Sequence, residues 1–459
     1  MAGIGFRLKA LLQRNQLSAD LTAYTFAGVI SAGPLLLSIL GILLIGMLSL
    51  QVVSPPQLIT QFQVSVTYII AASLILTGTV QLLLTRFVAD RLFQEHYASI
   101  LPNYRGIMLI TTAAAGALGT LAALFAFSGE SPLYRVLMVM GFVLVSNIWI
   151  CLIVLASIKE YGAILFAFFA GYGLTVIAAV SLNEQGLEGL LGGFVIGQCL
   201  LLGCMIVVLH RRYPAAGPAF ISFDTLARAY RYPSLIWTGV LFNLGIWLDK
   251  FMFWFSTSGE QVIGPLRASI IYDLPIFLAY LCIIPGMAAF LLRLETDFAD
   301  SYKVYYDAIR EGGRLSHIDR AHSNMVRSAR QGLYEILKVQ ALVTLVVFAA
   351  GDSLLQSFGI SVLYFPLLKI DVVAAGLQVL FLGCLNVLLY LDRRQTVLRL
   401  SALFVVSNGL CTWLTLIIGP DTYGYGFAAS LVITVLASIY ALDRCFQRIT
   451  YETYMLQKP

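Results

Sequence analysis

Two ionisable residues interrupt one of the most apolar stretches of the sequence. Asp249 and Lys250 stand within FNLGIWLDKFMFWFS, residues 242–256, where most neighbours are aromatic or aliphatic. A charged side chain in a bilayer costs about 2.5 to 3.5 kcal/mol on insertion scales, and it usually faces a partner or a water-filled cavity. The pair is therefore the first candidate for a functional site.

Lys250 shares a helical face with residues that suit a sugar. Asn243, Trp247 and Trp254 are separated from Lys250 by seven, three and four positions, and such spacings bring side chains to one side of a helix. Sugar hydroxyls need polar partners, and the C–H face of a sugar ring can lie on an aromatic surface. An amide, a cation and two flat rings together predict contact with a carbohydrate.

Two arrangements could neutralise the cation of Lys250. Consecutive helical residues point about 100° apart, so Asp249 lies on a different stripe from Lys250, with Gly245 and Ser256. Asp273 enters the following apolar segment at a comparable depth. The sequence thus allows an Asp249–Lys250 pair or a Lys250–Asp273 pair. The predicted substrate path consists of Asn243, Trp247, Asp249, Lys250, Trp254 and Asp273.

A second interpretation gives the same stretch a role at the membrane surface. The pair lies near the predicted external end of its span, where a Lys side chain can extend to water and aromatic residues gather. The aromatic residues Phe251, Phe253, Trp254 and Phe255 would then form an interfacial belt. Three asparagines within other spans could likewise line a path or only bond between helices: Asn147, Asn386 and Asn408.

Composition predicts the elements that position these residues. The 459 residues are 59% hydrophobic and 12% charged, with a mean hydropathy of +0.86, which is typical of an integral membrane protein. A helix needs about 20 apolar residues to cross a bilayer, and the alternation of a membrane barrel is absent. We predict an all-α polytopic membrane protein with twelve transmembrane helices, at residues 24–50, 62–85, 106–128, 136–157, 161–182, 189–209, 234–256, 270–292, 339–359, 371–391, 398–418 and 424–442.

The basic residues predict which side of the membrane each loop faces, because cytoplasmic loops retain Lys and Arg. With the N-terminus inside, the cytoplasmic segments hold 25 of the 29 basic residues, and the external loops hold Arg135, Arg267 and Lys369. Both termini are therefore predicted to be cytoplasmic. The seven cysteines have no CxxC spacing, which argues against a disulfide framework or a zinc site.

The chain divides at a basic, proline-containing segment with six predicted spans on either side. Transporters are often built from two such repeats, with the substrate path between them. The predicted parts are a cytoplasmic amphipathic N-terminal helix (1–23), an N-terminal six-helix bundle (24–209), a cytoplasmic linker (210–233), a C-terminal six-helix bundle (234–442) with a cytoplasmic loop (293–338), and a cytoplasmic tail (443–459). The loop 293–338 is expected to form one or two amphipathic helices, either as a solvated charged surface or as a docking site for a cytosolic partner.

Gly33 and Pro34 interrupt the first predicted span. A proline in mid-span frees a backbone carbonyl and kinks the helix, so the two residues are a predicted bending point. Gly and Pro are also generally commoner in membrane helices than in soluble ones, which explains them equally well.

Missing motifs argue against several enzyme classes. The sequence has no GxxxxGK[ST], GxSxG or HExxH motif, each of which supplies particular phosphate-binding or catalytic groups. A glycosyltransferase that uses lipid-linked sugars would need acidic residues on an early external loop, and the first such loop, QVVSPPQLITQ, has none. We predict a transporter without catalytic residues, metal, cofactor or nucleic-acid partner.

Several long stretches resemble one known family. SAGPLLLSIL in the first span, NLGIWLDKFMFWF in the seventh, YDLPIFLAYLCIIPGMAAF in the eighth and the opening MAGIGFRLKALL are similar to the PelG family, the inner-membrane transporter of the bacterial Pel exopolysaccharide system. This family is placed in the multidrug/oligosaccharidyl-lipid/polysaccharide (MOP) flippase superfamily. The resemblance implies a MATE-like fold, with two six-helix bundles around a central cavity and an alternating-access mechanism.

The resemblance also implies a substrate and partners. It implies export of an N-acetylgalactosamine-rich polysaccharide across the bacterial cytoplasmic (inner) membrane, among membrane lipids. A cytosolic glycosyltransferase would make the polymer from UDP-sugar, alongside membrane subunits that include a cyclic-di-GMP receptor. If the ion-coupled members of the superfamily are a guide, Asp249 and Asp273 would carry protons, although polymer synthesis could instead push the chain out. The alternatives are a flippase for a lipid-linked oligosaccharide and a non-transporting membrane scaffold for the synthase.

Overall fold

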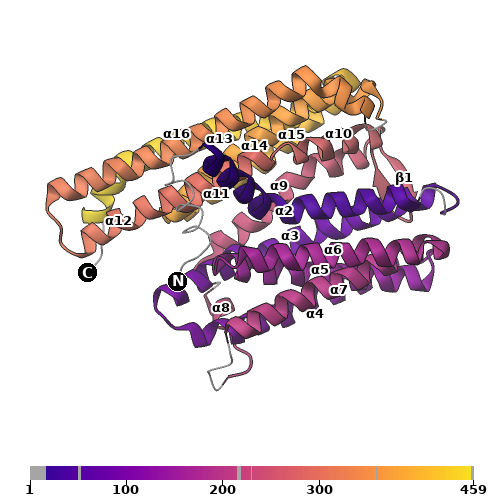
Figure 1. Cartoon of the computed structure of the whole chain (residues 1–459), viewed down its shortest axis with the longest axis horizontal. Coiled ribbons are helices and arrows are strands. Elements are labelled where there is room, and N and C mark those ends of the chain that lie inside the picture. Colours follow the sequence, from indigo (N-terminus) through magenta and orange to yellow (C-terminus); the bar gives the residue numbers. More distant parts are fainter. Residues whose placement is uncertain (1–16, 50–52, 214–218, 229, 358–359, 456–459) are drawn as a thin grey trace. The chain divides into compact units, whose positions relative to one another are not determined.

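The protein is almost entirely helical (Figure 1). A computed structural model describes residues 17–49, 53–213, 219–228, 230–357 and 360–455. Most of the predicted N-terminal surface helix and the end of the tail lie outside these residues. The helices of the first half are α2 (Leu17–Ser49), α3 (Gln57–Phe93), α4 (Ile100–Phe125), α5 (Pro132–Ser157), α6 (Tyr161–Ser181), α7 (Gly186–Arg212) and α8 (Asp224–Ala227).

The second half begins with α9 (Pro233–Trp254) and a short antiparallel hairpin, β1 (Glu260–Ile263) and β2 (Leu266–Ala268). The helices that follow are α10 (Ile270–Leu281), α11 (Ile284–Leu292), α12 (Ala299–Arg310), α13 (Leu315–Ser357), α14 (Phe365–Tyr390), α15 (Arg394–Ile418) and α16 (Tyr425–Met455). A π-helical turn, Arg293–Phe298, joins α11 to α12. The segment 293–338 contains this turn, α12 and the first part of α13. Its helices continue into the neighbouring spans, and its place as a cytoplasmic loop remains a prediction.

The all-α polytopic fold is confirmed. Within the described ranges, ten helices are long and apolar enough to cross a membrane, or up to twelve if each of two bent pairs is one span. The bent pairs are Tyr24–Pro34 with Leu37–Ser49, and Ile270–Leu281 with Ile284–Arg310. Several helices extend beyond the predicted spans, because hydropathy detects only the apolar part of a helix that continues into water.

The chain forms two compact units. The N-terminal unit contains residues 33–247 and 253–269, and the C-terminal unit contains residues 1–32, 248–252 and 270–459. The chain thus passes between units inside α2, next to Gly33 and Pro34, and inside α9, next to Asp249 and Lys250. The division at 210–233 and the bending at Gly33 and Pro34 remain predictions.

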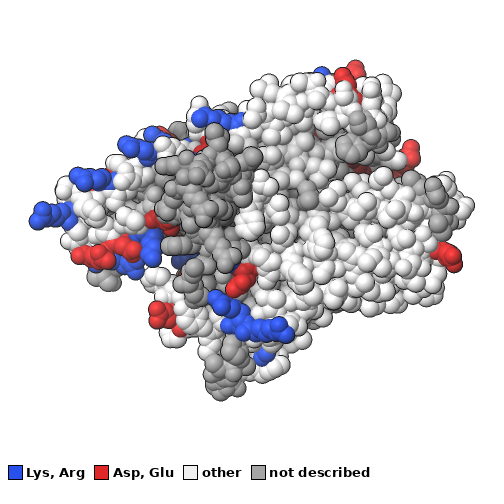
Figure 2. All heavy atoms as spheres, in the orientation of Figure 1, with Lys and Arg blue, Asp and Glu red and all other residues white. Residues whose placement is uncertain are grey.

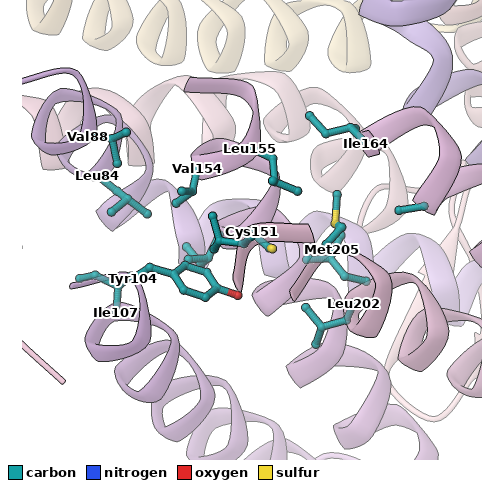
Figure 3. Packing of buried hydrophobic residues seen from close by; sticks show 14 of the residues in the cluster. Leu84, Val88, Tyr104, Ile107, Cys151, Val154, Leu155, Ile164, Leu202 and Met205 are labelled. Carbon is teal, nitrogen blue, oxygen red and sulfur yellow. The ribbon is translucent and has the colours of Figure 1, made fainter. Parts of the chain in front are cut away.

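The N-terminal unit is built from α3 to α7, which run alongside one another (Figure 1). Apolar side chains from α3, α4, α5 and α7 meet in a buried cluster that includes Leu84, Tyr104, Cys151 and Met205 (Figure 3). The hairpin is held on α3, because the Tyr68 hydroxyl donates a hydrogen bond to the carbonyl of Arg267 at 3.0 Å. This unit thus anchors the chain segment that follows α9.

In the C-terminal unit, α14 is the central helix. It contacts α10, α11, α13, α15 and α16, and 67% of its apolar window is buried, the largest share among the candidate spans. A side chain on α14 therefore meets protein on most sides, and any polar group that it carries must find its partner inside the unit.

Helix α9 crosses α3 at two glycines, Gly239 and Gly78. A Cβ atom on Gly239 would overlap the carbonyl oxygen of Gly78. A Cβ atom on Gly78 would lie 2.7 Å from the carbonyl oxygen of Gly239. We expect Gly239→Ala to lower the thermal midpoint of the purified protein, because overpacking typically costs about 1–3 kcal/mol. The control is Gly203→Ala in α7, where a Cβ meets nothing within 4 Å. Equal midpoints for the two variants would contradict this close crossing.

Candidate functional site

The two ionisable residues of α9 form a buried ion pair. Asp249 is 0% exposed and Lys250 is 3% exposed. The Lys250 Nζ atom lies 3.1 Å from Oδ2 and 3.3 Å from Oδ1 of Asp249, so the side chains bend toward each other although they leave the helix about 100° apart. Lys250 therefore does not extend to the membrane surface, as the second interpretation required.

Donors from two further helices complete the environment of Asp249. The Tyr272 hydroxyl on α10 donates to Oδ2 at 2.6 Å, and the Asn408 side-chain amide on α15 donates to Oδ1 at 3.4 Å. The Thr412 hydroxyl donates to the Asn408 carbonyl oxygen at 3.0 Å, which orients the amide with its donor toward Asp249. Asp249 thus keeps two neutral donors in addition to the ammonium of Lys250.

Aromatic rings enclose the ammonium of Lys250. Its Nζ atom lies 4.8 Å from the ring centre of Phe427 on α16 and 5.3 Å from that of Tyr280 on α10. A cation over the face of a desolvated ring gains about 2 kcal/mol. The Tyr280 hydroxyl also donates to the side-chain carbonyl of Gln378 on α14 at 3.3 Å. Helix α9, which carries Lys250, is therefore joined by α10, α14 and α16 in positioning its charge.

A second acid, Asp371 on α14, lies near this pair. It is 0% exposed, and neither of its carboxylate oxygens has a hydrogen-bond partner among the described residues. It is close enough for the charges of Lys250 and Asp249 to act on it. Gly424, with φ +85°, lies just before α16, and a Cβ there would be 3.2 Å from Oδ1 of Asp371. The carboxylate thus lies by the positive end of the α16 dipole.

These three groups define what the site can do. With all of them ionised, two carboxylates and one ammonium leave one uncompensated negative charge inside the membrane. One proton or one monovalent cation would remove it. No group of three or more His, Cys, Asp or Glu side chains suited to a metal ion occurs in the described part of the chain. The arrangement is suited to exchanging a single positive charge.

The other predicted path residues of α9 contact the N-terminal unit. The Asn243 amide donates to the side chain of Gln81 on α3 at 3.4 Å. The Trp254 ring stacks on Tyr68 at 4.6 Å, and the Trp247 ring lies 6.3 Å from that of Trp254. Both tryptophans are buried, with Trp247 9% and Trp254 2% exposed, so a sugar could contact their rings only after the surrounding side chains move.

The remaining polar residues have different partners. Asp273 is half-buried in the first turn of α10, next to Tyr272, which donates to Asp249. The Asn147 amide donates to Thr112 on α4 at 2.9 Å, and the Asn386 amide donates to Glu295 at 2.9 Å. Of the three asparagines, Asn408 is therefore the one that contacts the site.

Sequence reasoning missed Asp371 because of a boundary error. Residue 371 was the first position of a predicted span, where a carboxylate could reach water. The helix begins six residues earlier, at Phe365, and Asp371 lies in its second turn. The signal that could have located it is Pro366, because proline is favoured in the first turn of a helix.

Comparisons with known proteins identify a family and a fold. The family model described as "PelG: Putative exopolysaccharide Exporter (EPS-E)" matches residues 1–454. No curated protein matches. Solved structures with similar folds include an outward-facing multidrug resistance MATE family transporter of the MOP superfamily (TM-score 0.63, 12% identity, 94% of this chain and 96% of that one).

Two further structures have the same fold. A variant of the Vibrio cholerae MATE transporter VcmN matches with a TM-score of 0.63 and 13% identity, over 97% of this chain and 98% of that one. A MOP superfamily transporter from Pyrococcus furiosus matches with a TM-score of 0.61 and 11% identity, over 92% and 96%. The fold is therefore that of the MATE transporters.

Proposed function

We propose that this chain, which belongs to the PelG family of exopolysaccharide exporters, moves a growing polysaccharide out of the cytoplasm. The buried charge set, which consists of Asp249, Lys250 and Asp371, would drive each step. The substrate would be an N-acetylgalactosamine-rich polymer, as in the Pel system that the sequence resembles. The chain is a membrane transporter with the MATE fold and not an enzyme.

The observation that carries this proposal is that two buried carboxylates, Asp249 and Asp371, lie near one buried cation, Lys250. A buried carboxylate without a partner destabilises a membrane protein, and such residues usually mark proton or ion pathways. Here Lys250, whose charge acts on Asp371, is already bonded to Asp249. A proton on Asp371 would neutralise the site, and its loss would attract Lys250. The site therefore has two arrangements that differ by one proton.

The donors around Asp249 make this exchange feasible. When Lys250 moves toward Asp371, Asp249 retains the Tyr272 hydroxyl and the Asn408 amide. Removing a buried ion-pair partner altogether is strongly destabilising, but these two donors moderate that cost. Lys250 would then leave its position against the rings of Tyr280 on α10 and Phe427 on α16. Loss of the proton from Asp371 would thereby change the packing of these two helices.

The polymer itself needs a different surface, because N-acetylated sugars are neutral. We propose that Asn243, Trp247 and Trp254 contact it after the surrounding side chains move, since amides and aromatic faces suit sugars. Asp273 at the start of α10 belongs to the same proposed path. Gly33 and Pro34, where α2 passes between the units, are the proposed bending point of the transport cycle.

The proposed orientation follows from the basic loops, and the proposed membrane and partners follow from the resemblance to the Pel system. Both termini would face the cytoplasm of a bacterial cell, and the chain would lie in the inner membrane. A cytosolic glycosyltransferase using UDP-sugar would dock on the cytoplasmic loops and feed polymer into the transporter. Membrane subunits that include a cyclic-di-GMP receptor would regulate it.

The test uses cells that lack only this chain and keep the synthase. The cells are fed radiolabelled N-acetylgalactosamine, and label is measured in cytosol, membrane lipids and medium. We expect carrier-free labelled polymer in the cytosol, and its transfer to the medium when the chain is restored. Labelled glycan on an isoprenoid carrier would instead identify a flippase for a lipid-linked oligosaccharide. Absence of any labelled glycan would favour a scaffold that the synthase needs.

A further inference from the structure

The span formed by α10 and α11 is broken next to the charge set. Helix α10 (Ile270–Leu281) meets the segment Ile284–Arg310, which contains α11 and α12, at a bend of 40°. Pro285, in the first turn of α11, has no N–H to donate to the preceding turn. The turn is tightened instead, since the amide of Cys282 donates to the carbonyl of Ala279 at 3.0 Å. Irregular backbone at membrane depth is tolerated only where the protein satisfies it.

One side chain from α13 satisfies the break. The Gln340 amide, 3% exposed, donates to the carbonyl of Ile283 at 3.2 Å. It lies in a notch that two glycines leave open. A Cβ atom on Gly286 would overlap the Gln340 amide nitrogen, and a Cβ atom on Gly376 would lie 3.2 Å from the Cβ atom of Gln340. The notch therefore admits this side chain between α11 and α14.

The other half of the same amide is unused. The Oε1 atom of Gln340 is buried and has no hydrogen-bond partner within the described residues. Leaving such a group unsatisfied costs about 1–3 kcal/mol. A leucine or methionine would fill nearly the same volume without that cost. An amide at this position is explained if its carbonyl accepts a hydrogen bond in a second arrangement of the break.

A short series of contacts connects the break to Lys250. The ring of Tyr280 lies against the ammonium of Lys250, and the carbonyl of Tyr280 accepts from the amide of Ile283 at 3.4 Å. The carbonyl of Ile283 in turn accepts from Gln340. A displacement of Tyr280 would therefore change the geometry of the bond that Gln340 makes.

We propose that Gln340 is a positioning residue that holds the α10–α11 break so that Tyr280 faces Lys250, and that it changes hydrogen-bond partner when Lys250 leaves Asp249. The inference rests on the proposed role of Lys250 in export. Gln340 touches neither polymer nor proton, and it acts through Ile283 and Tyr280. A movement of Lys250 would then change the bend between α10 and α11.

A double-mutant cycle followed by hydrogen–deuterium exchange tests this coupling. The four proteins are wild type, Lys250→Met, Gln340→Leu and the double variant, and the measured peptide covers residues 278–290. With Gln340 present, Lys250→Met should speed exchange of this peptide about fivefold, a coupling within the usual range. In the Gln340→Leu background the same change should have less than about a twofold effect. A peptide of α6, residues 164–176, serves as the reference within each protein.

Equal factors in the two backgrounds would overturn the proposal. Gln340→Met is the second variant, because it retains the length of the side chain if leucine disturbs the fold. Gln340→Met loses the bond to Ile283 and the unsatisfied Oε1 atom together, and the two effects are of similar size and opposite sign. We therefore expect export to fall with little change in thermal midpoint, whereas a residue with only a structural role would lower both. If the coupling is found but cells lacking the chain still secrete polymer, the proposed function fails while the role of Gln340 stands.

Discussion

Lys250→Met is expected to stop polymer export and to destabilise the protein, and adding Asp249→Asn is expected to restore stability but not export. Removing one partner of a buried ion pair typically costs about 3–5 kcal/mol, because the other charge is left uncompensated. Neutralising both members removes that penalty. Export should not return, because neither the cation nor its acid would remain to exchange.

The measurements are the thermal midpoint of the purified protein and the labelled polymer in the medium, at matched membrane levels. Lys303→Met is the control, since Lys303 is exposed on α12 and should leave both quantities near wild type. Recovery of export in the Asp249→Asn/Lys250→Met protein would show that the pair is structural and that the site lies elsewhere.

Asp371→Asn is expected to raise the stability of the protein while lowering its export, an opposition of signs that a purely structural residue would not produce. The wild-type carboxylate oxygens are buried and have no partner in the described part of the chain. An uncharged amide of the same shape is also without a partner there, but burying a neutral polar group costs much less than burying an unpaired charge. Export should fall at least tenfold, because an amide cannot take up and release the proton.

The matched control is Asp421→Asn, because Asp421 is exposed just beyond α15. It should change neither midpoint nor secretion. If Asp371→Asn instead lowers the midpoint and leaves secretion unchanged, the carboxylate has a structural partner and the proposed proton site is wrong.

Hydropathy predicted the helical membrane architecture because membrane insertion is decided by local sequence. Each span must carry about 20 apolar residues on its own, so the windows found along the chain locate the helices without knowledge of their neighbours. The same local rule identified Asp249 and Lys250, since a charge inside an apolar window is visible in one segment.

The partners of that pair were not predictable in the same way. Tyr272 and Asn408 lie 23 and 159 positions from Asp249, and they meet it only because α9, α10 and α15 pack together. Helical spacing shows which residues share a face of one helix, and it does not show which neighbouring helix that face meets. In the same way, the spacing placed Trp247 and Lys250 on one face but did not show that Trp247 lies beside Trp254, or that Lys250 lies beside Tyr280 and Phe427.

The boundary of a single helix had a large effect on the predicted site. Starting α14 at residue 371 instead of Phe365 placed an acid at the membrane surface that is in fact fully buried. Helix boundaries are the least certain part of such predictions, and in membrane proteins they decide whether a charge counts as solvated or as functional.

The most direct test of the account is whether the proton gradient drives export. Cells that secrete labelled polymer are treated with a protonophore while UDP-sugar is kept at its initial level, and label is followed in the cytosol and the medium. The account predicts that secretion stops at once while labelled polymer continues to accumulate in the cytosol. Secretion that continues at its initial rate would contradict it, because synthesis alone would then push the polymer through the transporter.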